Sequence, residues 1–163
     1  MSGNGAMETG VAGPSRVLFI ASSGGHLAQI MALRPWWEQR ERSWATFDTP
    51  DVVSQLDGEQ IDFVRHPTTL NIPNLLRNTV IAWRVLRDRR PDLVVSTGAG
   101  AAIPFFVFAW VLGINSAYIE VYDRITSRTV TGRVCRPFAS VFCVQWEDQT
   151  VLYPGAVTIG PLL

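Results

Sequence analysis

The stretch Val17–Leu33, VLFIASSGGHLAQIMAL, decides the fold of this chain. Its first residues, Val17–Ile20, are all apolar and predict a buried strand. The Ser22–Gly25 segment predicts a tight turn, and His26 opens a run in which apolar residues recur at helical spacing. A strand that passes through a glycine turn into a helix is typical of a parallel α/β domain.

The same turn has the properties of an anion-binding site. Gly24 and Gly25 have no side chain, so a ligand can approach the backbone closely. The first amides of the new helix are unpaired donors, and the helix dipole adds partial positive charge. The His26 imidazole at this position can take up a proton near neutral pH. An ordinary glycine turn in which His26 is only a cap or a surface residue fits the motif equally well.

Two common nucleotide-binding motifs are excluded by the glycine spacing. Ser23-Gly24-Gly25-His26 lacks the third glycine of GxGxxG, and the chain has no GxxxxGK[ST] phosphate loop. This turn therefore predicts neither a dinucleotide-binding fingerprint nor a P-loop.

Size and composition limit the class of protein. At 163 residues the chain fits one domain with a real core, and it is 47% hydrophobic, 17% charged and formally neutral. No global charge is present to attract nucleic acid. Cys135 and Cys143 lack metal-ligand spacing, so we expect reduced core thiols of a cytosolic protein, without metal or cofactor. Six tryptophans favour an interface with a protein or a membrane.

Residues 1–15 are small and polar, and they lack the charged start and apolar core of a signal peptide. We expect a disordered arm there and one domain over residues 16–163. The most apolar stretch, Gly98–Ile114, is at the short edge of a membrane span and contains Pro104. It predicts a buried core helix.

Strands and helices alternate along the rest of the chain. The first helix is expected to continue to about Arg40. Further strands are expected at Trp44–Phe47, Ile61–Val64, Asp92–Ser96, Ser116–Val121, Val141–Val144 and Val157–Ile159. Further helices are expected at Asp51–Leu56, Leu75–Arg90 (with Asn74 as its cap), Ala101–Leu112 and Thr126–Pro137. This alternation predicts a doubly wound, Rossmann-like parallel sheet.

Polar features follow several of the predicted strands. Thr97–Gly100 repeats the arrangement of the first turn, with a strand, a glycine loop and then a helix. In doubly wound sheets the ligand lies beyond the carboxyl ends of the strands. Both glycine loops, His66 and the segment Glu120–Asp123 fall at that edge, and their meeting there is stronger evidence for a site than any one of them.

The acidic candidate is Glu120, which ends an apolar strand and should direct its carboxylate from a mostly buried position into the cleft. It could pair with Arg124 or cap the next helix. Alternatively, Glu120 and His26 together could hold and deprotonate a substrate hydroxyl. Asp123 is expected to be a cap, and His66 is expected to be an ordinary loop histidine.

The helix predicted at Leu75–Arg90 has an apolar face beside a basic one. Its apolar face comprises Leu76, Val80 and Trp83. Three more residues should extend that face toward the core: Leu75, Ala82 and Leu86. A stripe of arginines lies beside it: Arg77, Arg84 and Arg87. Such a helix is typical of peripheral attachment to anionic lipid, although a surface helix with solvated arginines has the same pattern.

Four segments together resemble one known family. They are SSGGH (22–26), RRPDLVVSTGAG (89–100), AYIEVYDRITSRTVTGRVCRPFASVFCVQW (117–146) and YPGAVTIGPL (153–162). The family is the membrane-associated subunit of a split glycosyltransferase. In eukaryotes this is the acceptor-side subunit of the enzyme that adds the second N-acetylglucosamine to a dolichol-diphosphate-linked N-acetylglucosamine. In bacteria the family includes PssD-type exopolysaccharide proteins, and the N-terminal half of MurG is similar. The resemblance covers roughly residues 16–163.

The resemblance implies the N-terminal half of a GT-B enzyme, attached peripherally to the cytoplasmic face of the membrane. This half would bind a polyprenyl-diphosphate-linked acceptor, and a small partner chain resembling the C-terminal half would supply the UDP-sugar site. The sugar would be N-acetylglucosamine or another hexose, and the chain would be inactive alone. A non-catalytic docking subunit for a catalytic partner is the alternative.

Site roles carry over by position from the resemblance. His26 would be the base on the acceptor hydroxyl, and Glu120 matches the acidic residue at the strand end. Acceptor binding falls to the two glycine loops: Ser23, Gly24 and Gly25 in the first, and Gly98, Ala99 and Gly100 in the second. The eukaryotic proteins have an N-terminal membrane helix that residues 1–15 cannot form, so attachment would rest on the amphipathic helix.

Overall fold

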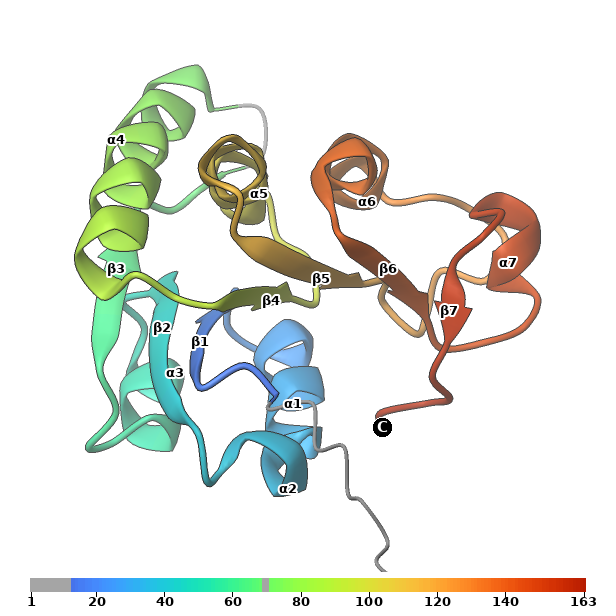
Figure 1. Cartoon of the computed structure of the whole chain (residues 1–163), viewed down its shortest axis with the longest axis horizontal. Coiled ribbons are helices and arrows are strands. Elements are labelled where there is room, and N and C mark those ends of the chain that lie inside the picture. The colour runs from blue at the N-terminus through green and yellow to red at the C-terminus, as the bar shows by residue number, and fades with distance from the viewer. Residues whose placement is uncertain (1–12, 69–70) are drawn as a thin grey trace, which may run out of the picture.

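The computed structural model describes residues 13–68 and 71–163, and it contains a seven-stranded parallel sheet (Figure 1). The strand order is β3-β2-β1-β4-β5-β6-β7. The strands are β1 (Arg16–Ile20), β2 (Glu41–Phe47), β3 (Ile61–Val64), β4 (Leu93–Ser96), β5 (Asn115–Ile119), β6 (Val141–Val144) and β7 (Val157–Thr158). The predicted doubly wound, Rossmann-like sheet is confirmed. Residues 1–12 of the predicted arm lie outside the described residues.

Helices cover both faces of the sheet. They are α1 (Gly25–Ala32), α2 (Arg34–Trp37), α3 (Pro50–Gln55), α4 (Ile72–Arg89), α5 (Ala102–Leu112), α6 (Val130–Cys135) and α7 (Gln149–Leu152), with a short 3₁₀ turn at Arg136–Phe138. In Figure 1, α4, α5 and α6 lie on one side of the sheet, and α1, α2 and α3 lie on the other. The chain order of strands therefore reverses direction at β1, which pairs with both β2 and β4.

The sequence of β1 explains why it lies at the centre. Side chains of a strand alternate between the two faces of the sheet, and both faces here are covered by helices. Leu18 and Ile20 therefore join the core under α4 and α5, whereas Val17 and Phe19 join the core under α1, α2 and α3. All four side chains are at most 1% exposed.

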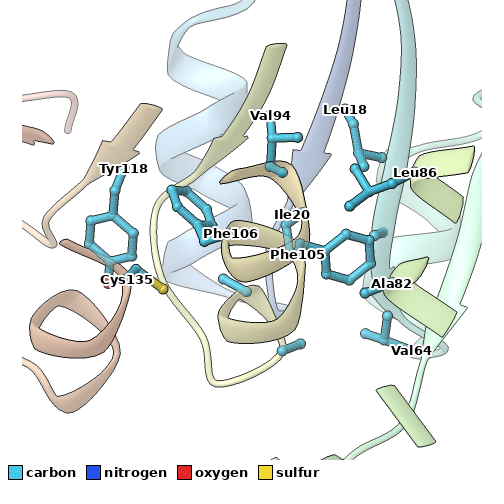
Figure 2. Packing of buried hydrophobic residues seen from close by; sticks show 14 of the residues in the cluster. Leu18, Ile20, Val64, Ala82, Leu86, Val94, Phe105, Phe106, Tyr118 and Cys135 are labelled. Carbon is cyan, nitrogen blue, oxygen red and sulfur yellow. The ribbon is translucent and has the colours of Figure 1, made fainter. Parts of the chain in front are cut away.

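The apolar segment after the second glycine loop forms α5, which packs between α4 and α6 as a core helix. Phe105 and Phe106 are fully buried: Phe105 points toward Ala82 and Leu86 of α4, and Phe106 packs edge-on against Tyr118 of β5 (Figure 2). This confirms the predicted buried helix. Within residues 13–68 and 71–163, no helix combines the length and apolarity needed to cross a bilayer.

The tryptophans divide between the core and the surface. Trp37 and Trp44 are buried and pack with Phe19, with the Trp44 ring centroid 4.7 Å from that of Phe19. The exposed tryptophans are Trp36, Trp83, Trp110 and Trp146. The composition argument for an interface therefore applies to these four. Both cysteines are buried free thiols, as predicted.

Three predicted helix boundaries were wrong for local reasons. The first helix does not continue to Arg40, because it ends at Leu33 and a separate short helix, α2, begins at Arg34 with Pro35 in its first turn. The cap of α4 is Asn71, whose side chain accepts a hydrogen bond from the Asn74 amide at 2.9 Å. The helix predicted at Thr126–Pro137 is shorter, because Thr129 caps it and only α6 forms.

Candidate functional site

A cavity of about 340 Å³ opens at the carboxyl edge of the sheet, where β1 and β4 lie side by side. Its wall combines the first loop, the second loop, the segment after β3 and the segment after β5. The lining residues are Ser22, His26, Phe47, His66, Thr68, Gly98, Ala99, Gly100, Tyr118, Val121, Thr129 and Thr131. A doubly wound sheet places its ligand at such a switch point.

His26, the second residue of α1, is fixed by two hydrogen bonds to Thr97 at the end of β4. The His26 ring nitrogen Nδ1 lies 2.8 Å from the Thr97 carbonyl oxygen. The Thr97 hydroxyl donates to the His26 carbonyl at 2.7 Å. Because a carbonyl oxygen only accepts, Nδ1 carries the ring proton, and Nε2 keeps a free lone pair. An imidazole held in this way can accept a proton from a hydroxyl in the cavity.

The second loop requires glycine where it touches the imidazole. Gly98 has a φ of 120°, and a Cβ atom there would lie 2.7 Å from the Cε1 atom of His26. A Cβ atom on Gly100 would lie 2.9 Å from the Thr68 hydroxyl oxygen. Between them, Ala99 has a φ of 79°, a strained value for a residue with a side chain and one that clusters at functional sites.

The first loop is open where the second is crowded. Gly24 has a φ of 70°, and no atom lies within 4 Å of a Cβ placed on Gly24 or Gly25. Both glycines are exposed. Of the predicted loop residues, Gly98, Ala99 and Gly100 line the cavity with His26, whereas Ser23, Gly24 and Gly25 lie outside its wall and Ser22 lines it instead.

Glu120 is fully buried immediately after β5, one layer behind the cavity wall. Its carboxylate accepts hydrogen bonds from the Val121 amide at 3.0 Å, from the Thr129 hydroxyl at 2.9 Å and from the Tyr153 hydroxyl. The prediction that the carboxylate points into the cleft was therefore wrong. Within the described part of the chain it also forms no ion pair with Arg124. It contacts the cavity through Thr129, which lines the wall and caps α6.

Tyr118 lies beside this carboxylate and also lines the cavity. Its hydroxyl is buried and forms no hydrogen bond with any described residue. Burial, together with the negative charge of Glu120, raises the pKa of the Tyr118 phenol well above its usual value. The phenol is therefore a neutral group, and its lack of a partner costs stability in the free chain.

His66 lines the cavity, although the sequence predicted an ordinary loop histidine. Its ring packs edge-on against Phe47, with the ring centroids 4.9 Å apart. The segment that carries it is held by two buried side chains of α4, Asn74 and Asn78. Two asparagines four residues apart on the otherwise apolar inner face of α4 were the signal in the sequence, because buried amides need a partner.

Three glutamine side chains brace the ends of β5 and β6. The Gln145 amide donates to the Glu120 carbonyl at 2.9 Å and to the Gln29 side chain of α1 at 2.5 Å. The Gln149 side chain donates to the Val121 carbonyl at 2.9 Å. Gln145 is therefore a buried brace between these strand ends and α1.

The outer surface of α4 is apolar and basic, as the sequence predicted. Ile72, Leu76, Val80 and Trp83, which we call the α4 outer face, are 70%, 64%, 70% and 38% exposed. Arg77, Arg84 and Arg87 are exposed beside them, and the Arg87 guanidinium lies over the Trp83 ring. Of the residues expected to extend this face into the core, Ala82 and Leu86 are buried, but Leu75 is 39% exposed.

Comparison with known proteins agrees with this architecture. Residues 59–162 match the family described as "Oligosaccharide biosynthesis protein Alg14 like". The UDP-N-acetylglucosamine transferase subunit ALG14 of Mus musculus is 23% identical over 91% of this chain and 83% of its own length. The subunit of the same name from Eremothecium gossypii is 28% identical over 98% of this chain and 85% of its own length.

Among solved structures, MurG of Acinetobacter baumannii superposes with a TM-score of 0.72 at 20% identity. The match covers 90% of this chain and 44% of the MurG chain, so this chain spans less than half of that enzyme. The likeness shows a shared fold, that of the N-terminal half of a GT-B enzyme, as the sequence analysis expected.

Replacing Gly98 with alanine should destabilise the protein, because it adds a Cβ atom at a positive φ against the His26 ring. We expect Gly98→Ala to lower the free energy of unfolding by about 1–3 kcal/mol, measured by urea denaturation. Gly25→Ala, where space is open, is the matched control and should change it by less than about 0.5 kcal/mol. Equal effects of the two variants would contradict the close packing of Gly98 on His26.

Tyr118→Phe should stabilise the free chain, because it removes a buried hydroxyl that has no partner. We expect its free energy of unfolding to rise by about 1 kcal/mol. Tyr153→Phe is the control, since that hydroxyl donates to Glu120, and it should lower the same quantity by about 1–3 kcal/mol. A loss of stability in Tyr118→Phe would mean that the hydroxyl is satisfied in the folded protein.

Proposed function

Because the chain belongs to the Alg14-like family of oligosaccharide biosynthesis proteins, we propose that it is one subunit of a two-chain glycosyltransferase. The enzyme transfers N-acetylglucosamine or another hexose from a UDP-sugar to a polyprenyl-diphosphate-linked acceptor. This chain binds the acceptor, and a separate chain that resembles the other half of a GT-B enzyme supplies the UDP-sugar site. The names of the ALG14 subunits and the extent of the match to MurG support this division.

The observation that carries the proposal is the state of His26. Its Nδ1 atom is committed to the Thr97 carbonyl, and its Nε2 atom is left as a base in a cavity between two glycine loops. In the proposed reaction Nε2 takes the proton of an acceptor hydroxyl while that oxygen bonds to the anomeric carbon of the donor sugar. The bond from that carbon to UDP breaks, and UDP leaves with the bonding electrons.

The remaining site residues take binding and positioning roles. Gly98, Ala99 and Gly100 lead into α5, whose dipole suits the acceptor diphosphate. The first two amides of α5 already donate to the Ala99 and Gly100 carbonyls. The amides that would bind the diphosphate are therefore those of Ala99 and Gly100, which donate to no described residue. Ser23, Gly24 and Gly25 lie at the start of α1 outside the cavity wall, where they would contact the part of the acceptor that lies beyond the cavity. Glu120 is a positioning residue, because it holds Thr129 and the start of α6 at the cavity wall.

The α4 outer face is proposed as the contact with the cytoplasmic face of the membrane. Exposed apolar side chains enter the boundary between headgroups and acyl chains, and neighbouring arginines bind anionic headgroups. Attachment is then peripheral, and it holds the cavity near a lipid-linked substrate. Trp83 combines both properties, since it is apolar and lies under the Arg87 guanidinium.

The catalytic role of His26 is tested by sugar transfer with and without the partner chain. We expect no transfer by this chain alone and transfer by the pair, and His26→Ala should reduce the rate of the pair by about 10²–10⁴-fold. Thermal unfolding and co-purification with the partner show whether the variant is folded and bound. Full turnover by the single chain would contradict the split enzyme. Intact turnover of the variant pair would favour the alternative, a docking subunit whose partner does the chemistry.

The membrane contact is tested by sedimentation with anionic vesicles. The double variant Trp83→Ala/Arg84→Glu should bind at least about tenfold more weakly, because it removes an interfacial ring and reverses a charge. Val151→Ala/Arg133→Glu is the matched control, since both residues are exposed on other helices, with Val151 79% exposed. Equal vesicle binding by the two double variants would contradict the proposed contact between α4 and the membrane.

A further inference from the structure

We propose that His66 is a second functional imidazole of the cavity, one that binds a phosphate of the ligand and moves no proton. The identity of that ligand as a lipid diphosphate rests on the proposed function. The contact between the imidazole and a phosphate can be tested independently of the proposed function. His66 would thus be a binding residue for the same reaction in which His26 is the base.

The charge of the cavity wall supports this contact. A diphosphate carries negative charge into the cavity, yet all 14 basic residues of the chain are arginines and none lines the cavity wall. Among the described lining residues, only His26 and His66 can become cationic. The Nδ1 atom of His26 is already bound to the Thr97 carbonyl. His66 is exposed and forms no hydrogen bond with a described residue through its ring, so both of its ring nitrogens can donate to phosphate.

The position of His66 beside the second glycine loop also suits a phosphate contact. The segment His66–Thr68 lies directly against the second glycine loop, where a Cβ atom on Gly100 would be 2.9 Å from the Thr68 hydroxyl oxygen. The loop leads into α5, whose dipole favours an anion, and the loop amides of Ala99 and Gly100 donate to no described residue. A phosphate seated there would have backbone amides on one side. On the other side it would meet the Thr68 hydroxyl and the His66 imidazole, both of which line the same cavity.

Two side chains of α4 hold this segment at three backbone atoms. The Asn78 side chain accepts from the Arg65 amide at 2.7 Å and donates to the Arg65 carbonyl at 3.0 Å. The Asn74 side chain donates to the Pro67 carbonyl at 3.0 Å. Both asparagines occupy core positions, with Asn74 8% and Asn78 1% exposed. The backbone on both sides of His66 is therefore fixed, and a preorganised imidazole binds a ligand with less loss of entropy.

The binding test uses the fact that the chain has two histidines. With ¹³C-labelled histidine in the full chain, the two imidazole Cε1–H signals are assigned from His26→Ala and His66→Ala. Farnesyl diphosphate is the probe, and farnesol is the control that lacks phosphate. We expect farnesyl diphosphate to shift the His66 signal at concentrations at which farnesol leaves it unchanged. A His66 signal that both compounds leave unchanged would overturn the proposal.

The kinetic test separates binding from proton transfer in the enzyme with its partner chain. His66→Ala should raise the acceptor KM and the inhibition constant of farnesyl diphosphate about tenfold or more, with kcat within about twofold, as loss of a charged hydrogen bond predicts. His66→Arg should restore most of the affinity. Arg65→Ala is the matched control, because it removes a full charge one residue away, outside the cavity wall. An equal loss in Arg65→Ala would mean general electrostatic attraction and overturn the contact.

The two tests separate this proposal from the proposed function. A shifted His66 signal in a protein that transfers no sugar with any partner would support the phosphate contact and contradict the proposed transferase function. The opposite result is sugar transfer by the pair with an unshifted His66 signal and an unchanged KM in His66→Ala. It would support the transferase function and contradict the phosphate contact.

Discussion

The contact between the His26 imidazole and the backbone of the second glycine loop is the constraint on which the site depends. The ring lies against Gly98 and is bonded to Thr97, 71 residues away in the chain. Such a contact requires β1 and β4 to be neighbours, which follows from the reversal of strand order at β1. The cavity, the tautomer of the imidazole and the need for glycine at position 98 all follow from this pairing. The sheet topology is therefore part of the proposed chemistry, because it sets the state of the base.

The fold was predictable because its determinants are local in sequence. Short apolar strands, glycine turns and helix periodicity alternate along the chain, and right-handed crossovers leave few topologies for such a pattern. The same reasoning placed His26 and the second glycine loop at one edge. It did not place Glu120, because a strand pattern tells which residues are buried but not whether a buried carboxylate faces a cavity or a neighbouring helix. Thr129 and Tyr153, which donate to that carboxylate, lie 9 and 33 residues further along the chain. Their contact with Glu120 is a tertiary contact that local sequence patterns do not predict.

The burial of Glu120 also has a physical reason. A buried charge is stable only when hydrogen bonds replace its hydration, and here an amide and two hydroxyls do so. A carboxylate so fully bonded holds three segments together at the carboxyl edge of the sheet. Tyr118, next to it, is the opposite case, with a buried hydroxyl that no described residue satisfies. The cavity wall thus combines a rigid support with one unsatisfied polar group, as binding sites do when stability is given up for function.

The two faces of α4 connect the surface of the molecule with the cavity. Its outer face is apolar and flanked by arginines, whereas its inner face uses Asn74 and Asn78 to fix the backbone around His66. Helical periodicity identified the outer face, but it wrongly assigned Leu75 to the core. Leu75 is exposed because the two buried asparagines shift the buried face around the helix axis. An apolar inner face would pack equally well, yet it would leave the amide and carbonyl of Arg65 without these partners. In the proposed enzyme the helix that contacts the lipid surface therefore also sets the position of the cavity wall that receives the lipid-linked headgroup.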